Sequence, residues 1–199
     1  MNAVRSVVLG DGDIARILAE ALGTPRAAPG AAIPSGTNGV VLVVGGQPGS
    51  AQPLETLTAD RWHRDVEFSV ASALTVLRDA KAAMPSGGRI VLVVPTLGVT
   101  GAPGLVSYTT AMEGIRAMAK SAARQWACEG VGVNLVAVPV GLIAPELASA
   151  DAHHSAPALG RDVDLSATVI RAVAVLLGHE LDHLAGATLV VDGGSVMLP

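Results

Sequence analysis

The feature that most constrains the fold is a strand–helix–strand pattern over residues 88–137. Two short apolar runs rich in β-branched residues, at residues 89–94 and 131–138, flank a long segment with helical periodicity. A loop rich in Gly, Pro and Thr precedes that segment, which carries the single tyrosine of the chain, Tyr108. Apolar strands joined by a helix are typical of a parallel sheet that is buried on both faces. The stretch therefore predicts an α/β fold.

The rest of the chain continues the alternation of strands and helices. Thr58 is a suitable N-cap for a long helix, and residues 139–164 are expected to form a partly helical lid. Residues 23–39, rich in Gly, Pro, Ala and Ser, are expected to form a loop. Further strands are expected at residues 4–9, 40–44 and 187–191, and further helices at residues 14–22, 59–84 and 165–177. This order predicts a doubly wound parallel sheet of about five strands, with helices on both faces.

Composition and charge exclude several classes of protein. Half of the 199 residues are hydrophobic, which suits a single domain over residues 1–199 with a large core. The net charge of −4 argues against a nucleic-acid partner, because no basic stripe exists to neutralise phosphates. No apolar run approaches the ~18 residues of a membrane span, and the N-terminus lacks a signal-peptide pattern. The one cysteine, Cys128, allows no internal disulfide. We therefore expect a cytoplasmic protein without a membrane partner.

The motifs of this chain resemble those of the short-chain dehydrogenase/reductase family. The resemblance rests on VTGAPGLVSY at residues 99–108, VNLVA at residues 133–137 and VVDGG at residues 190–194. It implies a Rossmann-like fold and, in a complete member, a catalytic serine, tyrosine and lysine with an NAD(P) cofactor. Tyr108 matches the tyrosine, but Pro95 stands at the serine position and Met112 at the lysine position. The resemblance therefore covers the scaffold, and only one of these three catalytic residues.

Tyr108 has few chemical partners in the sequence. In the family the lysine lowers the tyrosine pKa, which is near ~10 for a free side chain. Neither Arg116 nor Lys120 replaces it, because Lys120 lies twelve residues on, roughly 18 Å along a helix axis. Ser69 stands at the position of a helical asparagine of the family, and Thr96 follows Pro95. Ser69 and Thr96 are possible neighbours of Tyr108 in a cleft. Tyr108 is either a retained packing residue or the remnant of a catalytic site.

The nucleotide-binding region also departs from the family pattern. The glycine turn of the family is represented by a degenerate loop with Gly10 and Gly12, and Asp11 and Asp13 accompany them. A carboxylate at a helix start is expected to satisfy the free amides itself and to repel a diphosphate. The loop of residues 23–39 stands where the family has its second and third strands, so the first strand is expected at the sheet edge. We therefore expect no nicotinamide cofactor.

A zinc-protease signature also occurs near the C-terminus. HELDH at residues 179–183 matches HExxH, in which both histidines must lie on one face of a helix. The motif lies between the last helix and the last strand, where the family has a turn. His153 and His154 are not expected to supply a third ligand. No metal site is therefore expected.

The leading functional expectation is a pseudoenzyme, a non-catalytic subunit of a homo- or hetero-oligomeric short-chain-dehydrogenase assembly. The helix at residues 59–84 is apolar on more than one side, with Phe68 outside its main stripe. In the family this helix and the one at residues 105–129 form a subunit interface. Two alternatives remain open. One is a nucleotide-independent isomerase, dehydratase or cyclase that uses Tyr108, and the other is a degenerate NAD(P)-dependent ketoreductase.

Overall fold

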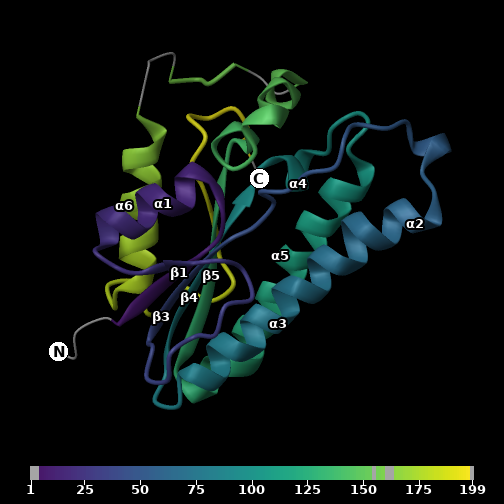
Figure 1. Ribbon diagram of the computed structural model, residues 1–199. Helices are drawn as coiled ribbons and strands as arrows, with labels where there is room; N and C mark the ends of the chain where they lie inside the picture. Colours follow the sequence, from purple (N-terminus) through teal and green to yellow (C-terminus); the bar gives the residue numbers. More distant parts are fainter. Residues whose placement is uncertain (1–4, 154–155, 160–163, 198–199) are drawn as a thin grey trace.

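The computed structural model describes residues 5–153, 156–159 and 164–197. In these ranges the chain forms one parallel sheet of six strands in the order β2-β1-β3-β4-β5-β6 (Figure 1). The strands are β1 (Ser6–Leu9), β2 (Arg26–Ala27), β3 (Gly39–Val43), β4 (Gly88–Pro95), β5 (Val131–Val138) and β6 (Thr188–Val190). The predicted doubly wound α/β fold is thus confirmed.

Helices cover both faces of the sheet. α1 (Gly12–Leu22) and α6 (Leu165–Leu177) lie together on one face, and α3 (Phe68–Ala83) and α5 (Val106–Trp126) lie on the other (Figure 1). Alternate strand residues point to opposite faces, so each strand serves two cores. Val8, for example, packs with the α1 and α6 side, whereas Val7 and Leu9 pack with the α3 and α5 side.

The edge of the sheet differs from the expectation. β1 is not an edge strand, because Val8 and Leu9 pair with Arg26 and Ala27 of β2, and the sheet has six strands rather than about five. Gly23, with φ of +62°, ends α1 in the left-handed conformation and turns the chain back toward β1. A strand of two residues has no alternating pattern, and so the sequence of residues 23–39 reads only as a loop.

The helix expected at residues 59–84 is interrupted by a wider turn. It consists of α2 (Ala59–Trp62), a π turn (His63–Glu67) and α3. Thr58 is its N-cap, as predicted, and its side chain accepts a hydrogen bond of 3.3 Å from the amide of Arg61. π turns are frequent at functional sites because they change which side chains face a neighbouring surface.

The lid and the C-terminal segment meet above the sheet. The lid contains two 3₁₀ segments, Val140–Leu142 and Pro145–His153, whereas His154 lies outside the described residues. The amide of Leu159 donates to the carbonyl of Gly193 at 3.1 Å. The carboxylate of Asp192 accepts from the amides of Gly194 and Val196, each at 2.8 Å, and so fixes the turn of the VVDGG motif. None of the helices in the described ranges combines the length and the apolar character needed to cross a membrane.

Candidate functional site

A cavity of about 800 Å³ lies where the chain leaves the carboxyl ends of β1, β2 and β3. Ligands of open α/β sheets bind outside the carboxyl ends of the strands. Five parts of the chain form the walls of this cavity. They are Asp11, residues 28–30, residues 42–49, one side of the continuous helical segment formed by α2, the π turn and α3 (from Arg61 to Val76), and the pair Tyr108 and Met112. The volume falls within the range of about 300–1,000 Å³ usual for small-molecule sites.

Tyr108 ties α5 to the loop that follows β3. Its ring is buried, and its hydroxyl donates a hydrogen bond of 2.9 Å to the carbonyl of Gly45. Gly45 has φ of +91°, and a Cβ there would lie 2.6 Å from the Tyr108 hydroxyl oxygen and 3.1 Å from Sδ of Met112. Only glycine permits this approach.

The residues at the other two catalytic positions are apolar and buried. Met112 follows Tyr108 by one helical turn, and Pro95 is the last residue of β4. A methionine provides no cation and a proline provides no hydroxyl group. Neither Pro95 nor Met112, which motif spacing matches to the serine and lysine positions of the family, therefore supplies a hydroxyl group or a cation.

The structure brings some of the predicted site residues together and leaves others apart. Ser69, on α3, lines the same cavity as Tyr108 and Met112. Thr96 does not line it. The Thr96 side chain is buried, and its amide donates to the carbonyl of Val138 at 2.8 Å.

The glycine turn between β1 and α1 leaves its helix amides uncapped. Gly10 has φ of +153° and Gly12 has φ of +81°, and Gly10 lies so close to β3 that a Cβ there would be 2.8 Å from Cβ of Val43. Asp11 is the N-cap residue, yet its side chain makes no capping hydrogen bond. Asp13 points to solvent and pairs with Arg16 at 3.2 Å. The expectation that a carboxylate satisfies these amides is therefore wrong, because within the described ranges neither Asp11 nor Asp13 caps the first turn of α1.

A polar network on the π turn was not predicted. Arg61 is ion-paired with Asp65 and donates to the carbonyl of Ser50 at 2.9 Å, and the Ser107 hydroxyl donates to Asp65 at 3.0 Å. This network joins the π turn to the start of α5 and to the loop after β3. The spacing of four residues between Arg61 and Asp65 was its one signal in the sequence.

The HExxH match lies on a turn, as predicted, between α6 and β6. His179 lies 3.2 Å from Asp182, and Asp182 forms an ion pair with Arg89. The hydrogen bond from Arg89 lowers the pKa of the Asp182 carboxyl below its usual value, although partial desolvation opposes the shift. Within the part of the chain that the structure describes, no group of three His, Cys, Asp or Glu side chains could hold a metal ion.

The parallel sheet, its two helical layers and a cavity at its carboxyl edge define a Rossmann-like α/β protein. Residues 32–196 match a family model described as enoyl-(acyl carrier protein) reductase. The chain belongs to the short-chain dehydrogenase/reductase family, an oxidoreductase family.

Two curated relatives illustrate the similarity in sequence. The chain is 29% identical over 172 residues to a diacetyl reductase [(S)-acetoin forming] of Staphylococcus aureus, a match covering 77% of this chain and 66% of that protein. It is 28% identical over 146 residues to a 3-oxoacyl-[acyl-carrier-protein] reductase of Salmonella typhimurium, covering 70% and 59%. The chain thus spans two thirds or less of the length of these relatives.

Solved structures share the fold. The TT0495 protein of Thermus thermophilus has a TM-score of 0.75 and 21% identity, with 97% of this chain and 98% of that chain covered. An NAD(P)-dependent gluconate 5-dehydrogenase assigned in Beutenbergia cavernae has a TM-score of 0.75 and 20% identity, with 98% and 97% covered.

The expectation of no nicotinamide cofactor is corrected by these comparisons, because NADP is bound at low occupancy in the Beutenbergia cavernae structure. Two errors led to that expectation. Residues 28–30, part of the segment expected to form only a loop, line the cavity. Asp11 also does not occupy the amides at the start of α1.

Proposed function

We propose that this chain is a dinucleotide-binding member of its family that acts as a non-catalytic subunit of a short-chain-dehydrogenase assembly. The observation that carries the proposal is the hydrogen bond of 2.9 Å from the Tyr108 hydroxyl to the carbonyl of Gly45. It makes the tyrosine a structural tie between α5 and the loop after β3.

The residues around the cavity fit a nicotinamide dinucleotide. The uncapped first turn of α1, with Gly10 and Gly12, provides backbone donors for phosphate oxygens. Residues 28–30 and the glycines that follow β3 would hold the rest of the molecule. When bound, such a cofactor supplies hydride transfer, and the protein supplies its orientation.

The side chains beside Tyr108 do not support proton transfer. In the family the tyrosine exchanges a proton with a substrate oxygen, and a lysine lowers its pKa. Here Met112 and Pro95 occupy the partner positions and are buried, so a charged group introduced at either one would be costly without a partner. A dinucleotide held beside Tyr108 would therefore lack an efficient proton donor.

The first test separates binding from turnover. NADPH and NADH are titrated into the protein while energy transfer from tryptophan is followed, since Trp62 adjoins Arg61 of the cavity wall. Reduction of diacetyl and of a 3-oxoacyl thioester is then measured for the wild type and for Tyr108→Phe. We expect saturable binding, and for both proteins the same background rate of cofactor oxidation.

Two outcomes would contradict the proposal. If neither nucleotide bound saturably at millimolar concentration, the proposal that this chain binds a dinucleotide would be wrong. If the wild type reduced a substrate and Tyr108→Phe abolished that activity, the proposal of a non-catalytic subunit would be wrong and a catalytic ketoreductase would be favoured. Ser69 and Tyr108 line one cavity, which is the observation that favours this second candidate.

A further inference from the structure

Some of the charged side chains that line the cavity are neutralised by an ion pair, and others are not. Four charged side chains contribute to its walls, namely Asp11, Arg61, Arg64 and Asp65. Arg61 and Asp65 form an ion pair in which the side chains keep 19% and 15% of their exposure. Their charges are therefore largely cancelled, which leaves Arg64 and Asp11 on different walls.

Arg64 is held by no carboxylate of its own helix. Within the described residues no hydrogen bond or ion pair engages its guanidinium. Glu67, three residues further on, pairs instead with His63 at 2.6 Å. Arg64 thus offers the cavity a positive charge with several donors.

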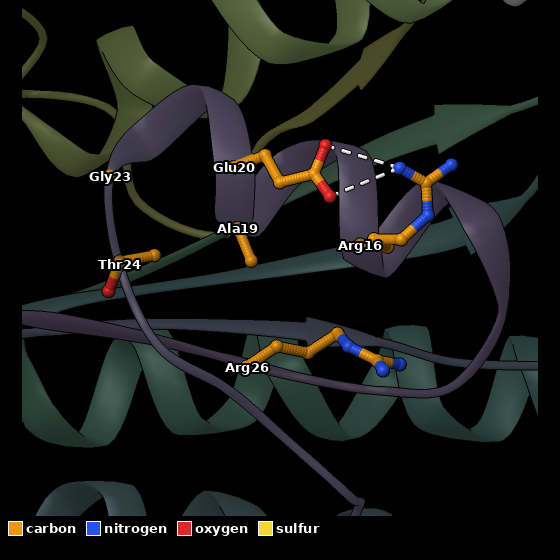
Figure 2. Close-up of a pocket in the computed structure, with 6 residues that line it drawn as sticks. All are labelled: Arg16, Ala19, Glu20, Gly23, Thr24 and Arg26. Carbon is orange, nitrogen blue, oxygen red and sulfur yellow. Dashed lines mark hydrogen bonds and ion pairs between the residues drawn. The ribbon is translucent and has the colours of Figure 1, made fainter.

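The arginine closest to the end of β2 does not serve this cavity. Arg26 lines a separate groove of about 420 Å³ together with Arg16 and Glu20 of α1. Figure 2 shows the Arg26 side chain beneath α1, and Arg16 bonded to Glu20. The segment after β2 contributes only Ala28, Pro29 and Gly30 to the larger cavity.

This arrangement bears on the ribose of a bound dinucleotide. In dinucleotide-binding folds a carboxylate near this point accepts a hydrogen bond from the 2′-hydroxyl of NAD, and a nearby arginine accommodates the 2′-phosphate of NADP. Residues 28–30 carry no carboxylate, so nothing there repels a phosphate. The cation of the cavity that has no carboxylate partner among the described residues, Arg64, comes instead from the π turn.

We propose that Arg64 is a specificity-determining residue that makes this cavity prefer dinucleotides with a phosphate on the adenosine ribose. The inference rests on the proposed function, because it concerns the same cavity. Phe68 follows Arg64 by one helical turn, lines the same cavity and is 70% exposed. Its ring offers a flat apolar surface for a base whose phosphate reaches Arg64.

The test compares ligands that differ by one phosphate. NADPH and NADH are titrated by their own fluorescence into the wild type, Arg64→Gln, Arg26→Gln and Arg78→Gln, and 2′,5′-ADP and 5′-AMP serve as competing fragments. Arg26→Gln removes the cation nearest to β2. Arg78→Gln makes the same charge change on the exposed side of α3, away from the cavity. We expect the wild type to bind NADPH about tenfold or more tightly than NADH, as a charge-assisted contact implies.

The expected variant pattern is specific. Arg64→Gln should bring the two dissociation constants within about twofold by weakening NADPH alone, and both control variants should keep the wild-type ratio. Equal wild-type affinities, an unchanged ratio in Arg64→Gln, or a ratio lost in Arg26→Gln would each overturn the inference, although the proposed binding function would stand. Failure of both nucleotides to bind would instead overturn the proposed function, and this inference with it.

Discussion

At Gly45 the lack of a side chain decides where the hydroxyl of Tyr108 lies. The glycine occupies a left-handed conformation, and its carbonyl accepts a hydrogen bond of 2.9 Å from the hydroxyl of this buried tyrosine. With any other amino acid at position 45, a Cβ would lie only 2.6 Å from the hydroxyl oxygen of Tyr108. One backbone position therefore determines whether the tyrosine can act as a structural tie.

Gly45→Ala is expected to destabilise the protein by about 1–3 kcal/mol, because alanine is strained at this φ and its methyl group displaces the hydroxyl. Urea unfolding followed by tryptophan fluorescence measures the change. In a Tyr108→Phe background the cost should fall, since the closest atom is gone. If Gly45→Ala lowered the free energy of unfolding equally in both backgrounds, the contact with the Tyr108 hydroxyl would not contribute to the destabilisation.

At the scale of elements, the π turn (His63–Glu67) organises the site more than any strand does. The π turn carries Arg64 and Asp65, and the hydrogen bond from Ser107 to Asp65 joins it to α5. A regular helix over the same residues would direct these side chains differently, because each turn would be one residue shorter.

The pair of Arg61 and Asp65 should be energetically coupled. We expect Arg61→Gln and Asp65→Asn each to cost about 1–3 kcal/mol, less than for a fully buried pair because both side chains retain some solvent contact. A double-mutant cycle in urea should give a coupling of about 1 kcal/mol or more.

The matched control for this cycle is the exposed pair of Arg16 and Glu20, which has the same spacing of four residues. Its coupling should stay below about 0.5 kcal/mol. If the two cycles gave the same value, the network at the π turn would be no stronger than a surface ion pair.

The sequence predicted the elements with strong periodicity and missed those without it. β5 and α6 begin and end at the expected residues, since their apolar patterns are long and unbroken. The π turn was missed because its residues remain compatible with a plain helix. For the candidate site, motif spacing indicated Tyr108 and Ser69, which line the cavity, whereas an arginine on a helix, such as Arg64, usually indicates a solvated face.

At the scale of the whole molecule, the outer face of α3 and α5 is the surface we propose for assembly with a second subunit. Leu74 is 44% exposed on α3, and Val70, Met118 and Trp126 are only partly buried. Such apolar surface favours association at about 25 cal/mol per Å² before the entropic cost of binding is subtracted.

Light scattering at micromolar concentration should therefore give a mass that is a multiple of 19.9 kDa. Leu74→Asp should reduce it to the monomer value without loss of circular dichroism, because the substitution places an unpaired charge in the contact. Leu54→Asp, on an exposed 3₁₀ turn (Leu54–Thr56), is the matched control and should leave the mass unchanged. A wild-type mass near 19.9 kDa would exclude self-association through this face.

The shortness of β2 affects how the protein behaves in a crowded solution. An open sheet edge is a template on which strands of other molecules can add and grow into fibrils. β2, one of the two outer strands, has only two residues, one of them the charged Arg26, and Pro25 and Pro29 stand close to its ends. Prolines lack the amide that an incoming strand requires, and the charge must lose its hydration to be covered. The edge formed by β2 is therefore a poor template for the addition of strands from other molecules.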